Sequence, residues 1–223
     1  MAEVAALVEL DDPVLGRLVV GSGETVVLLG PSGAGKTRLI RVLLGLDGSV
    51  PEPVLSVRGR HARPQDLAAL VGWVPEGDGV FLSDSIWDNV AHPPGVAPID
   101  AGLARDALDL VGLVERAREP VANLPRRGRR RVALARALAS RRPLLIVDGE
   151  LDPTLWTLLP GVLEQAPGVE SVLLATATAG DRAWTADTVA LVTGERLVAQ
   201  APLAELIGSS DPEVRSVLTW VSL

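Results

Sequence analysis

The sequence contains no cysteine, no tyrosine and a single phenylalanine. Because cysteine is absent, disulfides and thiolate metal sites are excluded. No run of 18 apolar residues occurs, so we expect no membrane-spanning helix. The first residues, Met1 to Val4, lack a basic region followed by an apolar stretch, so we expect no signal peptide. These absences together predict a cytoplasmic protein.

Charge and length narrow the class of protein further. The 223 residues include 21 basic and 28 acidic side chains, which gives a formal net charge of −7. Because nucleic-acid-binding proteins present basic surfaces, we expect no nucleic-acid partner. Apolar residues make up 48% of the chain, which is enough for the core of one large α/β domain with or without a small subdomain.

One stretch contains a complete phosphate-binding pattern, G-x-x-x-x-G-K-S/T. It consists of Gly30, Pro31, Ser32, Gly33, Ala34, Gly35, Lys36 and Thr37. An apolar run at 25–29 precedes it and a helical run at 38–46 follows, which is the strand–loop–helix context that the pattern requires. Lys36 would reach the β- and γ-phosphates, and Thr37 would bind Mg²⁺. The stretch therefore predicts, in preference to a chance glycine-rich turn, that this chain binds a nucleoside triphosphate with Mg²⁺ or descends from one that did.

The pattern of apolar residues predicts strands that alternate with helices. Two antiparallel strands are expected at 4–10 and 14–20, leading into a strand at 25–29. Further strands are expected at 54–57, 71–76, 144–148 and 171–176, followed by a closing hairpin at 188–192 and 196–199. Helices are expected at 38–46, 65–70 and 155–165, across most of 82–140, and in the tail from 203 to 221.

This order predicts an α/β fold, a doubly wound parallel sheet with the core of a P-loop NTPase, N-terminal antiparallel strands and a helical subdomain. We expect a single domain over 1–223. Its parts would be a core at 1–81 and 141–203, a helical subdomain at 82–140 and a tail at 204–223. Because ligands of such sheets bind at the carboxyl ends of strands, we expect the phosphate loop and Asp148 at the ligand site.

With these motifs in place, the chain resembles an ABC-type nucleotide-binding domain over nearly its whole length. Five segments match that family in order: Walker A at 30–37, the strand entering the Q-loop at 71–76, a signature-like stretch with its helix at 124–138, Walker B at 144–148, and a closing hairpin and helix at 186–206. The resemblance implies binding of ATP and Mg²⁺. It also implies a second ABC-type ATPase subunit, an integral membrane permease subunit, and a place at the cytoplasmic face of the cell membrane.

A narrower resemblance is to the ATPase subunit of Mce/Mla-type lipid transporters. It rests on three softer stretches, Val80–Pro93, Ala107–Ala117 and Ser209–Trp220. This resemblance implies lipid as the transported substrate.

Several chemical positions depart from the ABC pattern. After Asp148 the family has a glutamate that polarises the attacking water, whereas this chain has Gly149. General-base catalysis is worth about 10² to 10⁴ in rate. Glu150 is a weak candidate for the missing base, because successive residues of a strand face opposite ways. The family's switch histidine is replaced by Ala177, and residues 1–30 contain no aromatic side chain to stack on adenine.

The signature and the Q-loop also differ. In place of Leu-Ser-Gly-Gly-Gln, the signature-like stretch consists of Leu124, Pro125, Arg126, Arg127 and Gly128. An arginine clamp on a phosphate of the opposing subunit is one interpretation. A solvated helix start is preferred, since a helix N-terminus gains nothing from arginine. Glu76 replaces the Q-loop glutamine, and its carboxylate can ligate Mg²⁺ together with Thr37 and Asp148.

Three functions are compatible with this sequence. The preferred one is an ATP-binding transport subunit that binds ATP–Mg²⁺ with weak or no hydrolysis and pairs with a different ATPase subunit rather than with itself. The second is an inert scaffolding or regulatory relative that binds partners and little nucleotide. The third is an active ATPase that uses Glu150 or another acid. The tryptophans are expected in the core or at interfaces, and both histidines on surface loops.

Overall fold

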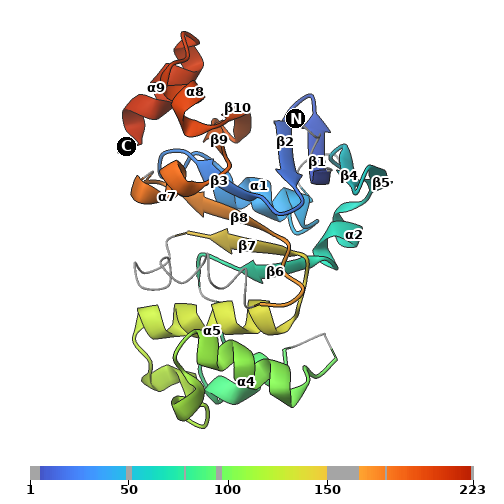
Figure 1. Ribbon diagram of the computed structural model, residues 1–223, viewed down its shortest axis with the longest axis vertical. Coiled ribbons are helices and arrows are strands. Elements are labelled where there is room, and N and C mark those ends of the chain that lie inside the picture. Colours follow the sequence, from blue (N-terminus) through green and yellow to red (C-terminus); the bar gives the residue numbers. More distant parts are fainter. Residues whose placement is uncertain are drawn as a thin grey trace. The chain divides into compact units, whose positions relative to one another are not determined.

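The computed structural model describes residues 6–48, 52–77, 79–93, 97–149, 166–178 and 180–221, without the side chains of residues 181 and 182. The chain forms two compact units. The first unit comprises residues 1–70 and 170–223, and the second unit comprises residues 71–169. Figure 1 colours the elements of both units by their place in the sequence.

The first unit contains four sheet strands in the order β10-β9-β3-β8. β3 (Thr25–Leu29) pairs in parallel with β8 (Ser171–Thr176) and with β9 (Thr188–Thr193), and β9 forms an antiparallel hairpin with β10 (Arg196–Ala201). All six residues of β8 and four of the five in β3 are buried. Parallel strands that are apolar on both faces belong inside an α/β fold. The predicted strands and the closing hairpin are confirmed.

A second, antiparallel sheet of the first unit has the order β2-β1-β4-β5. Its strands are β1 (Ala6–Asp12), β2 (Gly16–Gly21), β4 (Leu55–Val57) and β5 (Arg60–Ala62). The predicted N-terminal antiparallel pair is confirmed. β5 was not predicted, because only Ala62 of its three residues is buried and no apolar alternation marks it. Arg58 (φ 49°) and Gly59 (φ 71°) join β4 to β5 with the two positive φ angles of a type I′ turn.

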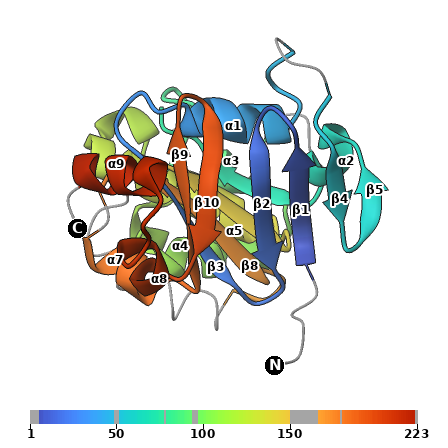
Figure 2. The same ribbon diagram turned by 90° about the horizontal axis from the view of Figure 1, so that it is seen from above.

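Five helices are described in the first unit: α1 (Lys36–Leu43), α2 (Pro64–Ala68), α7 (Gly180–Thr185), α8 (Leu203–Ile207) and α9 (Pro212–Trp220). α8 and α9 lie beside the β9–β10 hairpin (Figure 2). The Asp211 carboxylate accepts hydrogen bonds from the backbone N–H groups of Glu213 and Val214 and so caps α9. The two predicted tail helices are confirmed, whereas α7 was not predicted.

The second unit combines a parallel pair of strands with helices. β6 (Val71–Val74) pairs with β7 (Leu144–Asp148), whose five residues are all buried. The helices are α3 (Ile86–Ala91), α4 (Ala101–Leu110) and α5 (Arg126–Ala139), with 3₁₀ turns at Val114–Arg116 and Val121–Asn123. α5 packs against α3, α4 and β6. Gly72 makes the last contact possible, because a Cβ there would lie 2.8 Å from the carbonyl oxygen of Ala137.

The helical character predicted for 82–140 is confirmed by α3, α4 and α5. The division into a core, a helical subdomain and a tail stays a prediction. The helix predicted at 155–165 lies outside the described residues. Within the part of the chain that the structure describes, no helix is long and apolar enough to cross a membrane.

Candidate functional site

The phosphate loop connects β3 to α1 within the first unit. Gly33 (φ 79°) and Gly35 (φ 98°) adopt positive φ angles that a side chain would strain, so the backbone of the loop favours glycine at these two positions. Gly35 immediately precedes the first residue of α1, Lys36. Ser32 and Gly33 are exposed, whereas Gly30 and Ala34 are buried. The loop therefore presents its tip to solvent from a fixed base, as a phosphate cradle at a helix start must.

Lys36 lies across this loop. Its ammonium group donates hydrogen bonds to the carbonyl oxygens of Gly30 at 2.7 Å and Pro31 at 2.9 Å. These bonds hold the charge at the loop rather than in open solvent. An ammonium in this place can bind the oxygens of an incoming phosphate.

The turn of the β9–β10 hairpin packs against the phosphate loop. The backbone N–H of Glu195 donates to the carbonyl oxygen of Ala34 at 2.9 Å, and the Glu195 carboxylate pairs with Arg38 of α1. A Cβ on Gly35 would lie 2.7 Å from the Cα of Glu195, and one on Gly30 would overlap the carbonyl oxygen of Val192. Sequence reasoning missed this contact, because Glu195 follows the phosphate loop by about 160 residues in the sequence and its only signal was the hairpin turn.

In the second unit, two acids come together where β6 and β7 end. Asp148 is the last residue of β7 and is 2% exposed, whereas Glu76 follows β6 and is exposed. Gly149 comes next to Asp148 and has φ 85°. A Cβ on Gly149 would lie 3.3 Å from the Cγ of Glu76, so the Glu76 side chain lies beside the place that a side chain at 149 would take.

Arg130 of α5 fixes the backbone of both strand ends. Its guanidinium donates to the carbonyl oxygen of Pro75, to that of Asp148 at 2.9 Å and to that of Gly149 at 3.4 Å. The residue is only 6% exposed. Sequence reasoning did not single it out from the surrounding arginines, although its spacing from Ala133, Leu134 and Ala137 places it on the buried face of the helix.

The signature-like residues begin α5. Leu124 is buried, Pro125 is the N-cap residue without a side-chain cap, and Arg126 and Arg127 are exposed in the first turn. Gly128 is intermediate in burial and packs on Leu124. This exposure is compatible with both interpretations of the stretch, a solvated helix start and an arginine clamp on a phosphate of the opposing subunit.

The residue before Ala177 contacts the phosphate loop, because the carbonyl oxygen of Thr176 accepts a hydrogen bond from the N–H of Gly30 at 3.4 Å. Ala177 follows β8 in the first unit, Glu150 lies outside the described residues, and His61 and His92 are exposed as expected. Trp184 is 57% exposed and Trp220 is 75% exposed, so these two tryptophans are not in the core. Trp156 lies outside the described residues.

The residues present suit ATP and Mg²⁺. In the first unit, the loop offers backbone N–H groups and an ammonium group to phosphates, and the Thr37 hydroxyl is a hard oxygen donor. In the second unit, the carboxylates of Asp148 and Glu76 are hard oxygen donors of the kind that Mg²⁺ takes. Across the described ranges, no three His, Cys, Asp or Glu side chains gather into a metal cage. Mg²⁺ commonly binds through one or two carboxylates together with substrate phosphates, so a cage is not needed.

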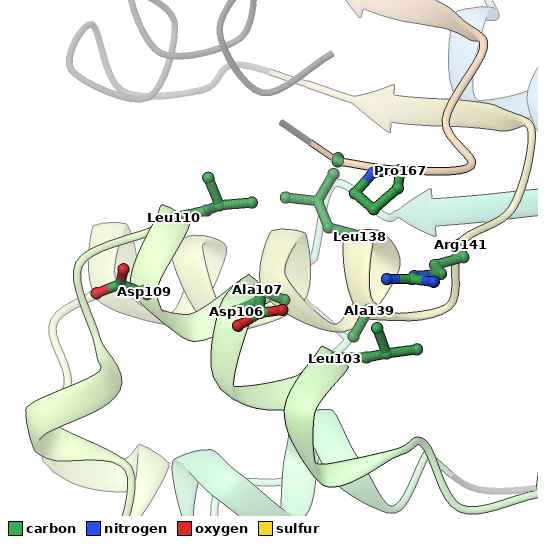
Figure 3. A pocket seen from close by; sticks show the side chains of 10 residues that line it. Leu103, Asp106, Ala107, Asp109, Leu110, Leu138, Ala139, Arg141 and Pro167 are labelled. Carbon is green, nitrogen blue, oxygen red and sulfur yellow. The ribbon is translucent and has the colours of Figure 1, made fainter. Parts of the chain in front are cut away.

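A pocket of about 290 Å³ lies elsewhere in the second unit, between α4 and the C-terminal end of α5 (Figure 3). Leu103, Leu138, Arg141 and Pro167 are among the residues that line it. Arg130 stands eight residues before Leu138 on α5, roughly 12 Å away along the helix. The pocket is therefore separate from the two acids.

Known proteins match this arrangement. The sequence model of the ABC transporter family matches residues 17–152. The methionine import ATP-binding protein MetN of Mesorhizobium japonicum is 34% identical over 218 residues, which cover 90% of this chain and 59% of that protein. The Fe(3+) ions import ATP-binding protein FbpC of Streptomyces avermitilis is 40% identical over 149 residues, which cover 62% of this chain and 42% of that protein. The chain thus spans about half the length of these curated relatives.

Solved structures share the fold. The structure of cbiO1 from Clostridium perfringens, part of the ABC transporter complex cbiONQ, gives a TM-score of 0.75 at 19% identity and covers 96% of this chain and 95% of its own. An ATP-binding subunit of an ABC transporter gives 0.76 at 23% identity, with 96% and 99% covered. The chain therefore belongs to the ABC transporter family, as one of its nucleotide-binding domains.

Proposed function

We propose that this chain is the ATP-binding subunit of an ABC-type membrane transport complex that binds ATP with Mg²⁺ and hydrolyses it weakly or not at all. The observation that supports this best is the contrast between two positions. The phosphate loop keeps its glycine conformations and its lysine, whereas the residue after Asp148 is a glycine at φ 85° that has no side chain to act as a base.

The proposed binding residues divide by role. The loop from Gly30 to Thr37 holds the phosphates, with Lys36 supplying the positive charge. Thr37, Asp148 and Glu76 hold Mg²⁺. The metal would supply neutralisation of the developing phosphate charge.

The proposed partners are an integral membrane permease and a second ABC-type ATPase subunit, at the cytoplasmic face of the cell membrane. A mixed pair is favoured over a self-pair, because the signature-like stretch lacks the serine and the adjacent glycines, and Arg126 and Arg127 add bulk there. Lipid is the proposed substrate, and it rests on the three stretches similar to Mce/Mla-type ATPases. Isolation of the chain from its own cells, with identification of the proteins and lipids that accompany it, tests these assignments.

Binding of a fluorescent ATP analogue, measured together with phosphate release, tests the nucleotide role. Lys36→Ala removes a charge-assisted contact worth about 1.5–3 kcal/mol, which corresponds to a loss of affinity of roughly 10- to 150-fold. Arg41→Ala is the matched control, since Arg41 lies exposed on the same helix, and it should bind as the wild type does.

The outcomes separate the alternatives. Binding that Lys36→Ala abolishes, with little phosphate release, supports the proposal. Absence of binding by the wild type would favour the scaffolding role. Phosphate release at about 1 s⁻¹ or faster, in the usual range of enzymes, would contradict weak hydrolysis.

A further inference from the structure

A strained residue lies in the turn of the β9–β10 hairpin. Gly194 (φ 55°) and Glu195 (φ 66°) are the two residues of this turn, since Thr193 and Arg196 on either side of them pair in the ladder. Two positive φ angles make it a type I′ turn, which favours glycine at its second position. The turn between β4 and β5 has Gly59 there, whereas this turn has a glutamate. Backbone strain of this kind concentrates at functional sites, where surrounding contacts hold it in place.

Three contacts hold Glu195 against the phosphate loop, and all of them lie within the first unit. Its backbone N–H donates to the carbonyl oxygen of Ala34 at 2.9 Å. Its carboxylate pairs with Arg38 in the first turn of α1. Its Cα, Cγ and Cβ are the three atoms nearest to a Cβ built on Gly35, at 2.7, 2.9 and 3.0 Å. One residue of the hairpin turn therefore contacts the loop, the helix and the residue that joins them.

The segment between these contacts is the one expected to bind phosphate. The stretch from Gly35 to Arg38 contains Lys36 and Thr37. Glu195 contacts the first and the last residue of this stretch, so it holds the segment at both ends. A binding site whose backbone is fixed beforehand loses less conformational entropy when its ligand binds. The contacts of Glu195 thus offset the strain of its own backbone and order the segment that carries the phosphate-binding side chains.

We propose that Glu195 is a positioning residue for the triphosphate, which does not bind the nucleotide itself but acts through Gly35 and Arg38 to keep the phosphate loop in its binding conformation. The inference rests on the proposed binding of ATP–Mg²⁺. Two simpler roles lead to different expectations. A carboxylate that acts only by its charge repels an anionic ligand, so its removal would tighten binding. A carboxylate that only stabilises the hairpin would change the free energy of unfolding and leave the affinity for ATP unchanged.

Glu195→Gly separates these roles. Glycine keeps the backbone N–H and suits the positive φ of the turn, but it has no carboxylate to pair with Arg38. We expect the affinity for the fluorescent ATP analogue to fall about three- to fivefold, the upper range for a partly exposed ion pair, while the midpoint of urea unfolding does not fall. Weaker binding without loss of stability distinguishes a positioning residue from one that only stabilises the hairpin.

A double-mutant cycle tests the path through Arg38. Glu195→Gln and Arg38→Gln should each weaken binding of the analogue. The double variant should bind no more weakly than the weaker of the two single variants, because all three lack the same ion pair. Glu213→Gln is the matched control, since it breaks the neighbouring ion pair between Arg196 of the hairpin and α9, and it should bind the analogue as the wild type does.

Several results would overturn the inference. Tighter or unchanged binding by Glu195→Gly would leave the carboxylate with a purely electrostatic or purely structural role. An equal loss of affinity in Glu213→Gln would assign the effect to the hairpin as a whole, and losses that add in the double variant would show that Glu195 does not act through Arg38. In each of these cases, binding by the wild type that Lys36→Ala weakens would leave the proposed function intact. Absence of binding by the wild type would refute the proposed function and this inference with it.

Discussion

Replacement of Arg130 by methionine tests how strongly one buried guanidinium stabilises the second unit. Methionine has a similar length and no donor, so the carbonyl oxygens of Pro75 and Asp148 lose their charged partner. Hydrogen bonds to charged groups contribute about 1.5–3 kcal/mol each, and part of that sum is offset because the wild-type protein buries a charge. We expect Arg130→Met to lower the free energy of unfolding by about 3 kcal/mol.

Urea unfolding followed by far-UV circular dichroism measures this change. With a slope of about 2 kcal/mol per molar urea, the midpoint should fall by roughly 1.5 M. Arg127→Met is the matched control, because Arg127 is exposed on the same helix, and it should change the free energy by no more than about 0.5 kcal/mol. Equal midpoints for the two variants would refute the view that Arg130 holds the strand ends together.

Three further substitutions test other contacts. Gly35 has φ 98°, and a Cβ there would lie 2.7 Å from the Cα of Glu195. Gly35→Ala should therefore strain the phosphate loop by about 1–3 kcal/mol, and we expect weaker ATP binding in titrations. The Gln200 side chain accepts a hydrogen bond from the N–H of Val19 at 2.8 Å and donates one to the Val19 carbonyl oxygen at 2.6 Å. Gln200→Leu should therefore lower the free energy of unfolding, measured by heat or urea, by about 2 kcal/mol. An unchanged stability would show that water satisfies this strand edge. The Asp100 carboxylate caps α4 by accepting hydrogen bonds from the N–H groups of Gly102 and Leu103 at 2.9 and 3.2 Å. Asp100→Ala should therefore lower the free energy of unfolding by about 1 kcal/mol, whereas Asp106→Ala on the same helix should lower it less.

Much of the fold could be predicted, because its signals are local. The buried strands β3, β7 and β8 each contain an uninterrupted run of four apolar residues. The phosphate-loop motif predicts a strand before it and a helix after it, which are β3 and α1. The tail helix α9 begins at Asp211-Pro212, a capping residue followed by a proline at the first helical position. Such patterns depend on a few neighbouring residues and do not require knowledge of what packs against them.

The misses have a different cause. β5 is held by its ladder to β4 and has little apolar character of its own, so tertiary pairing overrides its weak propensity. α7 is a short helix that starts at a glycine, which is a poor helix signal.

The candidate site shows the same division. The loop residues 30–37 could be named from the motif alone, and so could Asp148. Three other features depend on residues that are distant in sequence. They are the contact of Glu195 with the phosphate loop, the hydrogen bonds of Arg130 to the strand ends, and the position of Glu76 beside Gly149. A sequence pattern gives the identity of a residue but not the carbonyl oxygens that its side chain will reach.

The most direct measurement of the central claim is a titration of the purified chain with ATP and Mg²⁺, followed by identification of the nucleotide that stays bound. The account predicts saturable binding in which most of the nucleotide is still ATP after several minutes, and at least tenfold weaker binding by Lys36→Ala. Equal binding by the wild type and Lys36→Ala, or bound nucleotide that is already ADP within seconds, would contradict it.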